Sequence, residues 1–358
     1  MKTKIKLLLS FAVILGVGFM AACSDDDGGG KGADKETLLA SIAEAQDLLD
    51  NTEEGTSNGQ YLTGSQTALT AAVTAAAAVA ADKNATQTEV NNANVNLQAA
   101  ITTYESKIIT PIAPANLMAH WKFDEGTGTT ANDASDNNHD GTFKTGHAFW
   151  GAGNPTWTAD RYGNANRAIY FNAGSNIEVP YSTQLNPEKM TISLWMKQDV
   201  NTPTILNNQY MVAVNRWNGW KLNMQDSPKA FMTVKADVAG SPDPAYYDRD
   251  NADPILTQGD WYHVVVTFGD GHMIFYVNGT KVKDWDNTPG TGIDISANPI
   301  NLTIGQDLPT DKYTATEGDF YVNWGGYFKG VLDEVRIYNT PLTETQVTTL
   351  YNIEKPVE

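Results

Sequence analysis

Apolar residues follow three different spacings along this chain, and each spacing marks a separate region. Residues 7–19 form an almost unbroken apolar run close to the start. Residues 34–109 place apolar side chains every three or four positions, which predicts amphipathic helices. Residues 117–353 contain short runs in which apolar and polar residues alternate, bounded by Gly, Asn and Asp, which predicts antiparallel strands with one buried face.

The region with helical spacing predicts three helices packed as a small bundle. It holds no Trp or Pro, and its glycines all lie in one connection, a composition that favours helices. Ser65 is expected to begin the second helix, and Thr86 with Glu89 has the spacing of a capping box at the start of the third. The small alanine faces of the middle helix let its neighbours approach closely, so the bundle should be slim.

The region with alternating spacing predicts an all-β sandwich after a linker at residues 110–116. It contains all nine tryptophans of the chain. Trp195 and Trp261 stand inside apolar runs and are expected to be core anchors. Asn278 and Gly279 separate two such runs, which predicts a two-residue hairpin turn with positive φ.

Cys23 is the only cysteine in 358 residues and lies just after the first apolar run. Three lysines precede this run, which is too short for a committed membrane span and is typical of an export signal over residues 1–22. Ala21-Ala22-Cys23 resembles the lipobox of bacterial lipoproteins, in which the cysteine carries lipid. Several acyl chains together anchor a protein stably. The alternative is a signal anchor with an incidental thiol.

Residues 23–33 are expected to be a solvated tether, since their acidic and glycine residues bury little apolar area. The run SDDDGGG resembles the acidic signal that sends Bacteroidetes lipoproteins to the outer face of the outer membrane, with a plain linker as the alternative. The formal net charge of the chain is −18. Such a surface repels phosphate backbones, and no basic cluster interrupts it, so nucleic acid is not an expected partner.

Two longer resemblances cover most of the chain. The segments LLASIAEAQDLL, GQYLTGSQTALTAAVTAA and ATQTEVNNANVNLQAAI resemble the FIVAR-type module of bacterial surface proteins. This module is expected to be a spacer, with a glycan-binding bundle that uses Tyr61 as the alternative. Residues 117–353 carry RAIYFNAGSNIEVP, MTISLWMK, DWYHVVVTF, MIFYVNGTKV and GVLDEVRIYNTPLTETQVTTLY in the order of the laminin G-like domain, a concanavalin A-like jelly roll of the lectin/glucanase class. That resemblance implies two curved antiparallel sheets, a closing strand that ends at Asn339 and a short helix after Pro341.

Carboxylates test whether the sandwich is a glycosidase, because the concanavalin A-like class includes such enzymes. Retaining glycosidases need two carboxyl groups about 5 Å apart, and jelly-roll glucanases place them on one face with a Glu-x-Asp-x-x-Glu strand. That spacing does not occur in this sequence. Asp333 and Glu334 are adjacent in a strand and are expected to point to opposite faces, and His263 is expected to be a strand residue. The sequence therefore favours binding over catalysis.

A structural calcium ion is expected in the loop after the first strand of the sandwich. Residues 133–140 concentrate the oxygen donors that calcium prefers, among them Asp133 and Asn138. An EF-hand is excluded, because Lys144 stands where its bidentate glutamate would be. The laminin G-like resemblance implies that such a loop shares its ion with the acid of the last strand, here Asp333. The alternative is a polar turn without an ion.

Aromatic residues outside the strand motifs are the candidate ligand-binding residues. They lie beside Asn, Asp and Arg in the segments NRWNGWKL, PDPAYYDRD and NWGGYF. Flat side chains next to polar groups match sugar rings, which present apolar faces edged by hydroxyl groups. The candidates are Trp217, Trp220, Tyr246, Tyr247, Trp324 and Tyr327, with loop packing onto the sandwich as the alternative for each pair.

These observations predict a lipoprotein of the outer membrane that faces the cell exterior. Its jelly roll is expected to bind a polysaccharide or a glycoprotein glycan without cleaving it. Two other functions stay open. One is an enzyme of the concanavalin A-like class, or a domain associated with a glycoside hydrolase, and the other is an adhesin that binds a host or matrix protein.

Overall fold

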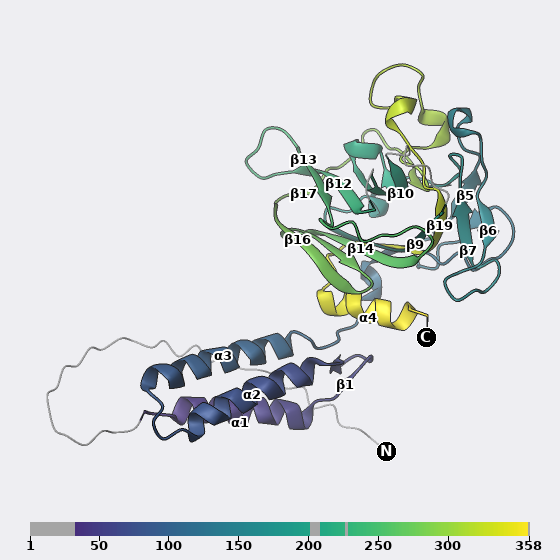
Figure 1. Ribbon diagram of the computed structural model, residues 1–358. Coiled ribbons are helices and arrows are strands. Elements are labelled where there is room, and N and C mark those ends of the chain that lie inside the picture. The colour runs from purple at the N-terminus through teal and green to yellow at the C-terminus, as the bar shows by residue number, and fades with distance from the viewer. Residues whose placement is uncertain (1–32, 201–207, 226–227, 357–358) are drawn as a thin grey trace.

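The computed structural model describes residues 33–200, 208–225 and 228–356, which form a helical bundle followed by a β-sandwich (Figure 1). The export signal, Cys23 and the tether up to residue 32 lie outside the described residues. Within the described ranges, no helix combines the length and the apolar character needed to cross a bilayer.

Three helices make up the bundle: α1 (Glu36–Asn51), α2 (Ser65–Ala81) and α3 (Gln87–Glu105). The predicted start of α2 and the predicted capping box of α3 are both confirmed, since Thr86 and Glu89 bond to each other's backbone amides. Apolar side chains from all three helices form the bundle core, including Leu38, Leu69 and Leu97. The connection between α1 and α2 also contains two short parallel strands, β1 (Glu54–Gly55) and β2 (Tyr61–Leu62).

The sandwich consists of two antiparallel sheets, as the alternating spacing predicts. The nine-stranded sheet contains, in spatial order, β13 (Ala245–Asp250), β12 (Ala230–Asp237), β11 (Trp220–Met224), β10 (Gln209–Val214), β18 (Leu302–Ile304), β8 (Asn176–Val179), β5 (Gly141–Lys144) and β4 (Thr130–Ala131), and β17 (Thr291–Gly292) pairs with β12. The eight-stranded sheet contains β16 (Thr280–Thr288), β15 (Gly271–Val277), β14 (Trp261–Gly269), β9 (Met190–Gln198), β19 (Gly330–Tyr338), β7 (Ala168–Phe171) and β6 (Thr156–Thr158), and β3 (Leu117–Trp121) pairs with β19.

The main core lies between the two sheets, because alternate residues of each strand face inward. In β11, Trp220 and Leu222 belong to this core, while Lys221 and Asn223 lie on the outer face. The prediction that one face is buried is incomplete, since Lys221 and Asn223 are buried as well. Other segments of the chain therefore cover the central strands on their outer side.

The two predicted tryptophan anchors differ. Trp195 is buried, but on the outer face of β9 rather than between the sheets, and its ring stacks on Tyr351 of the C-terminal helix at 5.8 Å. Trp261 is half-buried at the start of β14, with the Lys197 ammonium 5.7 Å from its ring. It is a partly exposed ring on the sheet rather than a core anchor.

Two local predictions in the sandwich are confirmed. The turn between β15 and β16 contains Asn278 and Gly279 with φ angles of 49° and 73°, as a two-residue hairpin of this type requires. The closing strand β19 ends at Tyr338, one residue before the expected end, and helix α4 (Glu344–Glu354) follows Pro341.

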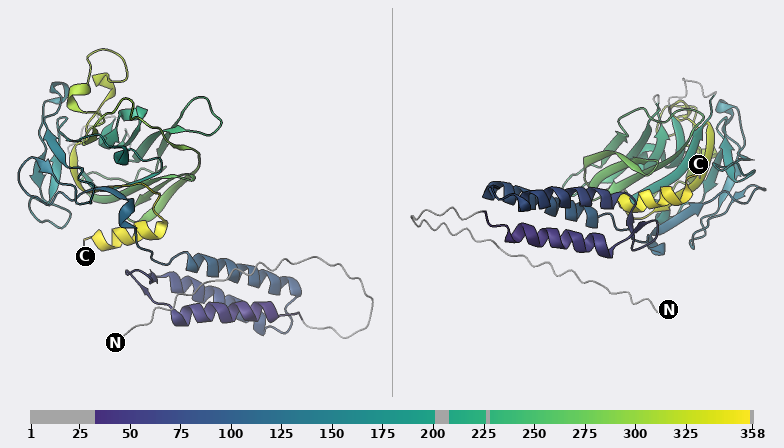
Figure 2. Two further views of the ribbon diagram at one scale, coloured as in Figure 1. Left: turned by 180° about the vertical axis from the view of Figure 1, so that it is seen from behind. Right: turned by 60° about the horizontal axis from the view of Figure 1, so that its bottom comes forward.

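Helix α4 covers the outer face of the eight-stranded sheet on the side toward the bundle (Figure 1, Figure 2). Val347 packs there with Tyr276 and Tyr338 in an apolar cluster separate from the main core. The bundle also contacts α4 directly, through an ion pair of 3.1 Å between Lys107 and Glu344. The hydroxyl of Thr345 donates to the Ser106 carbonyl at 3.0 Å, so the end of α3 and the start of α4 are joined.

Candidate functional site

The outer face of the nine-stranded sheet carries polar and aromatic side chains. In the register of its strands, Lys235 of β12 lies opposite Tyr246 of β13. Both point away from the core, because their neighbours Val234 and Tyr247 are core residues. The Lys235 ammonium lies 5.1 Å from the centre of the Tyr246 ring, a cation–π distance.

Two tryptophans lie beside this pair. The 3₁₀ turn η4 (Arg216–Asn218) connects β10 to β11 and carries Trp217, while η6 (Val322–Trp324) precedes β19 and ends at Trp324. The two ring centres are 5.5 Å apart at an interplanar angle of 44°. The Tyr210 hydroxyl, on the outer face of β10, points at the Trp324 carbonyl at 3.5 Å, which locates η6 over this face.

A hydrogen bond of 3.3 Å from Lys235 Nζ to Asn218 Oδ1 connects the tryptophan pair to Tyr246. We call the surface made by Trp217, Asn218, Lys235, Tyr246 and Trp324 the aromatic strip. Trp324 and Tyr246 are each 50 % exposed, and Trp217 is half-buried. The strip thus presents flat rings to solvent, with an amide and an ammonium group between them.

A buried ion pair holds the strip in place. Arg216 and Asp307 are both fully buried and their side chains meet at 2.6 Å. Burial raises the pKa of Asp307, and the Arg216 guanidinium opposes that shift. Arg216 also donates to the carbonyls of Asp319 and Tyr321, so it joins η4 to the segment that leads into η6.

The backbone of η4 explains how Arg216 points inward while Trp217 points outward. Asn215 and Arg216 have φ angles of 58° and 55°, in the left-handed region that residues other than glycine rarely adopt. The Arg216 guanidinium lies over the Trp217 ring, 4.9 Å from its centre, and packs against it. Such conformations persist where surrounding contacts determine them, and they concentrate at functional sites.

Three of the six predicted ligand residues lie in the strip and three do not. Trp220 is fully buried in the main core and donates its indole N–H to the Leu185 carbonyl at 3.2 Å. Tyr247 is 8 % exposed and donates its hydroxyl to the Pro289 carbonyl. Both assignments are corrected here, because strand alternation turns these rings inward. Tyr327 is half-buried, with its ring 6.4 Å from Trp150.

Sequence reasoning missed an aromatic group beside the strip. The turn η2 (Ala148–Trp150) follows β5 and carries Phe149 and Trp150, whose rings meet edge-on at 5.7 Å. Trp150 also contacts Tyr313 edge-on at 4.7 Å. The signal for this group was the pair of aromatic residues in the glycine-flanked segment GHAFWG.

The expected calcium ligands do not form a common site. Asp133 accepts hydrogen bonds from the amides of His120, Ser135 and His139 and from the Ser135 hydroxyl. Its two oxygens therefore already accept four donors, which fits a carboxylate that organises a loop better than a calcium ligand. These bonds lower the pKa of Asp133, although burial opposes them.

The other two expected ligands lie in different settings. Asn138 has a left-handed backbone with φ 58° and donates to the Asp136 carbonyl. Asp333 forms an ion pair of 2.5 Å with Arg161. In the part of the chain that the structure describes, no three His, Cys, Asp or Glu residues are grouped so as to hold a metal ion. Asp133 and Asp333 thus already have partners within the protein, and calcium binding stays a prediction.

The expectation that Asp333 and Glu334 point to opposite faces is also wrong. The register between β19 and β9 shifts at this point, and Glu334 has a left-handed backbone with φ 52°. Such a bulge adds one residue and interrupts the alternation. Both carboxylates consequently approach Arg161, at 2.5 Å from Asp333 and 3.8 Å from Glu334.

This acidic pair belongs to a network of ion pairs. Glu334 also bonds to His120 at 2.5 Å and to Arg336 at 2.6 Å. Although burial opposes the shift, these partners lower the pKa of Glu334 to about 2, whereas burial raises the pKa of Asp333 to about 8. His263 lies nearby in β14, fully buried as a strand residue, and bonds to the Ser193 hydroxyl at 2.9 Å.

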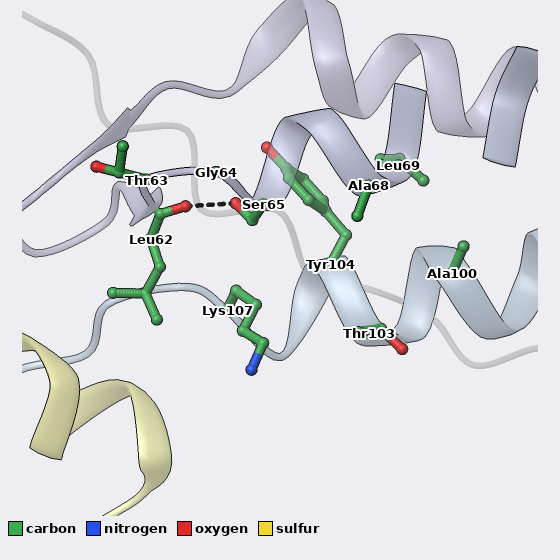
Figure 3. A pocket seen from close by; sticks show the side chains of 10 residues that line it. All are labelled: Leu62, Thr63, Gly64, Ser65, Ala68, Leu69, Ala100, Thr103, Tyr104 and Lys107. Carbon is green, nitrogen blue, oxygen red and sulfur yellow. Dashed lines mark hydrogen bonds between the residues drawn. The ribbon is translucent and has the colours of Figure 1, made fainter. Parts of the chain in front are cut away.

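The bundle contains a separate hollow of about 510 Å³ between the start of α2 and the end of α3 (Figure 3). Its lining is mostly apolar, with Leu62, Ala68 and Tyr104 on the walls and Lys107 at the side toward α4. Tyr61, the residue proposed for sugar stacking in a glycan-binding bundle, is 8 % exposed and stacks on Tyr104 at 4.4 Å. Its ring is therefore not accessible to a sugar.

Residues 171–348 match the family model described as the concanavalin A-like lectin/glucanases superfamily. This part of the chain is a concanavalin A-like domain of the laminin G type. Its two packed antiparallel sheets form the jelly-roll sandwich that the sequence resemblance implied. The match covers β8 to β19 and the start of α4, and therefore includes every residue of the aromatic strip.

Solved structures with a similar fold come from several kinds of protein. Domain 4 of AbnA, a GH43 extracellular arabinanase from Geobacillus stearothermophilus in complex with arabinotriose, is 22 % identical with a TM-score of 0.47, and the match covers 66 % of this chain and 98 % of that one. The binding domain of Paraclostridial Mosquitocidal Protein 1 is 19 % identical with a TM-score of 0.48, and the match covers 67 % of this chain and 52 % of that one.

A third similar structure is the ligand-binding domain of botulinum neurotoxin serotype D in complex with N-acetylneuraminic acid. It is 11 % identical with a TM-score of 0.43, and the match covers 67 % of this chain and 52 % of that one. This chain thus spans about half the length of the toxin chains. No curated protein matches the chain.

Proposed function

We propose that this protein binds carbohydrate through the aromatic strip and does not cleave it. The observation that carries the proposal is the pair of half-exposed rings, Trp324 and Tyr246, joined by Trp217, Asn218 and Lys235. The apolar face of a sugar ring can stack on such side chains while its hydroxyl groups bond to the amide and ammonium groups between them.

Preorganisation supports a ligand-binding role for the strip. The buried pair of Arg216 and Asp307 fixes η4 against the segment before η6, so the tryptophans are held in position before a ligand arrives. A site of this kind loses little conformational entropy on binding. Loop packing alone would not require half of the Trp324 surface to stay in solvent.

A binding function without hydrolysis also fits the acidic residues. Glycoside hydrolysis needs one carboxyl group as acid and a second carboxylate as nucleophile or base, both free to reach the sugar. Asp333 is 1 % exposed and paired with Arg161, and Glu334 is held by His120 and Arg336. An enzyme would release new reducing ends from a glycan panel, and such release would overturn this part of the proposal.

The proposed location is the outer membrane, with the protein anchored by lipid on Cys23 and the FIVAR-like bundle acting as a spacer. The bundle contacts the α4 side of the sandwich. The olive-coloured segment that carries η6 lies on the opposite side (Figure 1). An anchor before the bundle would therefore leave the strip facing away from the membrane.

Radiolabelled palmitate tests the anchor. The native chain is expected to take up label and to fractionate with the outer membrane, while Cys23→Ala should lose the label and leave the membrane fraction. Persistent labelling of the variant would contradict lipid attachment at Cys23.

Glycan binding is tested by comparing the native chain with Trp324→Ala on an array of polysaccharides and glycoprotein glycans. The native chain should bind at least one glycan class, and the variant should lose at least tenfold in affinity, since it removes one of the two half-exposed rings of the strip. Ile353→Ala is the matched control, because it removes a 66 % exposed apolar side chain on α4.

Protein adhesion is the second candidate function, because exposed tryptophan and tyrosine residues are also common in protein interfaces. A pull-down from host matrix in parallel with the array separates the two. Capture of a matrix protein after its glycans have been removed, with no binding on the array, would favour the adhesin.

A further inference from the structure

We infer that the bound carbohydrate is an internal stretch of an extended polysaccharide, contacted over several sugar units, rather than a single terminal sugar. This inference rests on the proposed function and specifies its ligand class. It depends on how the aromatic surface continues beyond Trp324.

The Trp150 ring lies directly against the backbone that follows Trp324. A Cβ atom added to Gly325 would lie 3.0 Å from Arg216 Nη2 and 3.1 Å from two ring carbons of Trp150, so a side chain at this position would disturb both. The glycine therefore lets Trp150 pack against the segment that carries Trp324. Phe149 lies beyond Trp150 and is 56 % exposed.

The exposed rings follow the strand order of the nine-stranded sheet. Tyr246 belongs to β13 at one edge, Trp217 follows β10 in the middle, and Phe149 follows β5 near the other edge. β13 and β5 are six strand positions apart. At about 4.8 Å between neighbouring strands, β13 and β5 lie roughly 29 Å apart along the sheet, a separation of several sugar rings.

Polar groups lie between the rings rather than at one end. Asn218 donates to the Asp319 carboxylate at 3.0 Å and accepts from Lys235, so amide, carboxylate and ammonium groups adjoin the middle of the row. In a site for one terminal sugar, several polar groups point into one enclosed pocket. Here stacking and hydrogen-bonding groups are spread along a line, the arrangement expected for a chain of repeated units.

Protein contacts support the rings near both ends of the row. Trp150, the neighbour of Phe149, meets Tyr313 edge-on at 4.7 Å and His147 edge-on at 5.9 Å. At the other end, the Lys235 ammonium holds the Tyr246 ring. A chain that reaches from one end to the other would gain from each contact without having to order the protein first.

The test uses the full chain and size ladders of arabino-, xylo-, manno- and cello-oligosaccharides, from the monosaccharide to the hexasaccharide, together with their parent polymers. In isothermal titration calorimetry, the affinity for the bound class should rise with each added unit up to at least the pentasaccharide. Phe149→Ala, which lies outside the aromatic strip, should weaken hexasaccharide binding about tenfold and leave disaccharide binding unchanged, since a disaccharide occupies the strip alone. Ile353→Ala should change neither.

The outcomes separate this inference from the proposed function. If the native chain binds a monosaccharide as tightly as the hexasaccharide and Trp324→Ala abolishes both, the strip binds sugar but the extended site is wrong. If Phe149→Ala weakens disaccharide and hexasaccharide binding equally, the row is not a series of subsites. If no ladder or polymer binds while the array detects a short glycoprotein glycan, the extended site is wrong and the proposed function stands; if the array detects no glycan either, both proposals fail.

Discussion

The two outer faces of the sandwich differ in what covers them. On the eight-stranded sheet, α4 buries the outer face, and charged side chains there are paired beneath it. On the nine-stranded sheet, the aromatic strip leaves two rings half in solvent above a buried ion pair. Both outer faces thus arise from the same alternation of strand residues. The face that α4 covers stabilises the fold, and the face that stays partly exposed is the candidate binding face.

Glu354 at the end of α4 shows how the covered face is held. Its carboxylate accepts from Trp195 at 2.9 Å and pairs with Arg336 at 2.5 Å, while its carbonyl accepts from Arg161 at 2.8 Å. Each of these partners comes from the sandwich, so one residue joins the end of the helix to three separate strands and loops. By contrast, no exposed ring of the aromatic strip joins so many separate segments of the sandwich.

The largest effect is therefore expected from Glu354→Ala. This substitution leaves the buried Arg336 and the Trp195 indole with fewer partners, which should lower the free energy of unfolding by about 3 kcal/mol. Urea denaturation of the full chain measures the loss. Glu344→Ala is the control on the same helix, since Glu344 forms partly exposed ion pairs and should cost less than about 1 kcal/mol. Equal losses would show that the buried cluster does not hold α4.

The next effect is expected from acid, through titrating groups of the covered face. Burial and nearby arginines lower the pKa of His263 from its ordinary value of 6.5 to about 3, so between these values the unfolded chain binds a proton that the folded chain does not bind. Glu334 has a pKa of about 2 instead of its ordinary 4.5, so its stabilising charge is lost as the pH falls from 4.5 toward 2.

Each of these groups reduces stability by about 1.4 kcal/mol for every pH unit within its window. Asp333, with a pKa of about 8, binds a proton in the folded state as the pH falls toward 4 and so opposes the effect of His263 in the native chain. His263→Gln should remove the destabilising contribution, so its urea midpoint between pH 6.5 and pH 4 should fall less, or rise more, than that of the native chain. A slope that is unchanged in this variant would show that His263 accepts its proton without unfolding the domain.

Substitution of Asp133 should have a smaller effect on stability. The same measurement distinguishes a bound calcium ion from a polar turn without an ion. Because the carboxylate accepts four donors within the protein, Asp133→Asn should cost about 1–2 kcal/mol, equally in chelator and in millimolar calcium. Melting curves of the native chain should coincide in the two buffers. A rise of several degrees with calcium, absent in Asp133→Asn, would instead restore the sequence prediction of a bound ion.

Local patterns predicted most of the fold. The hairpin at Asn278 and the capping box at Thr86 follow from a few neighbouring residues, while the closing strand before α4 was implied by the laminin G-like resemblance. The same strand alternation could have separated Tyr246 from Tyr247, and Trp220 from the outer face, because adjacent or alternate positions fix the side of the sheet. Because the candidate ligand residues were chosen by residue type alone, they included residues from both faces of the sheet.

Other features depend on contacts between distant segments and could not be predicted locally. A bulge forms at Glu334 because the register with β9 shifts there, and no residue in the segment DEVR predicts this shift. Arg216 meets Asp307 across 91 positions of the chain, and Trp150 meets Gly325 across an even longer separation. The supports of the strip are therefore tertiary, while its exposed rings could be selected from the sequence.

The smallest effect on stability is expected from Trp324→Ala, although it should have the largest effect on binding. The ring is half-exposed and contacts Trp217 and Tyr321 only at its edges and one face, so its removal should change the free energy of unfolding by no more than about 0.5 kcal/mol. Arg216 and Asp307 keep η4 in place without it. Urea denaturation of this variant, compared with Glu354→Ala, measures how far the two faces have separate roles. A loss of 2 kcal/mol or more would mean that Trp324 is a packing residue, and the loss of glycan binding in the same variant would then reflect a disordered loop rather than a missing contact.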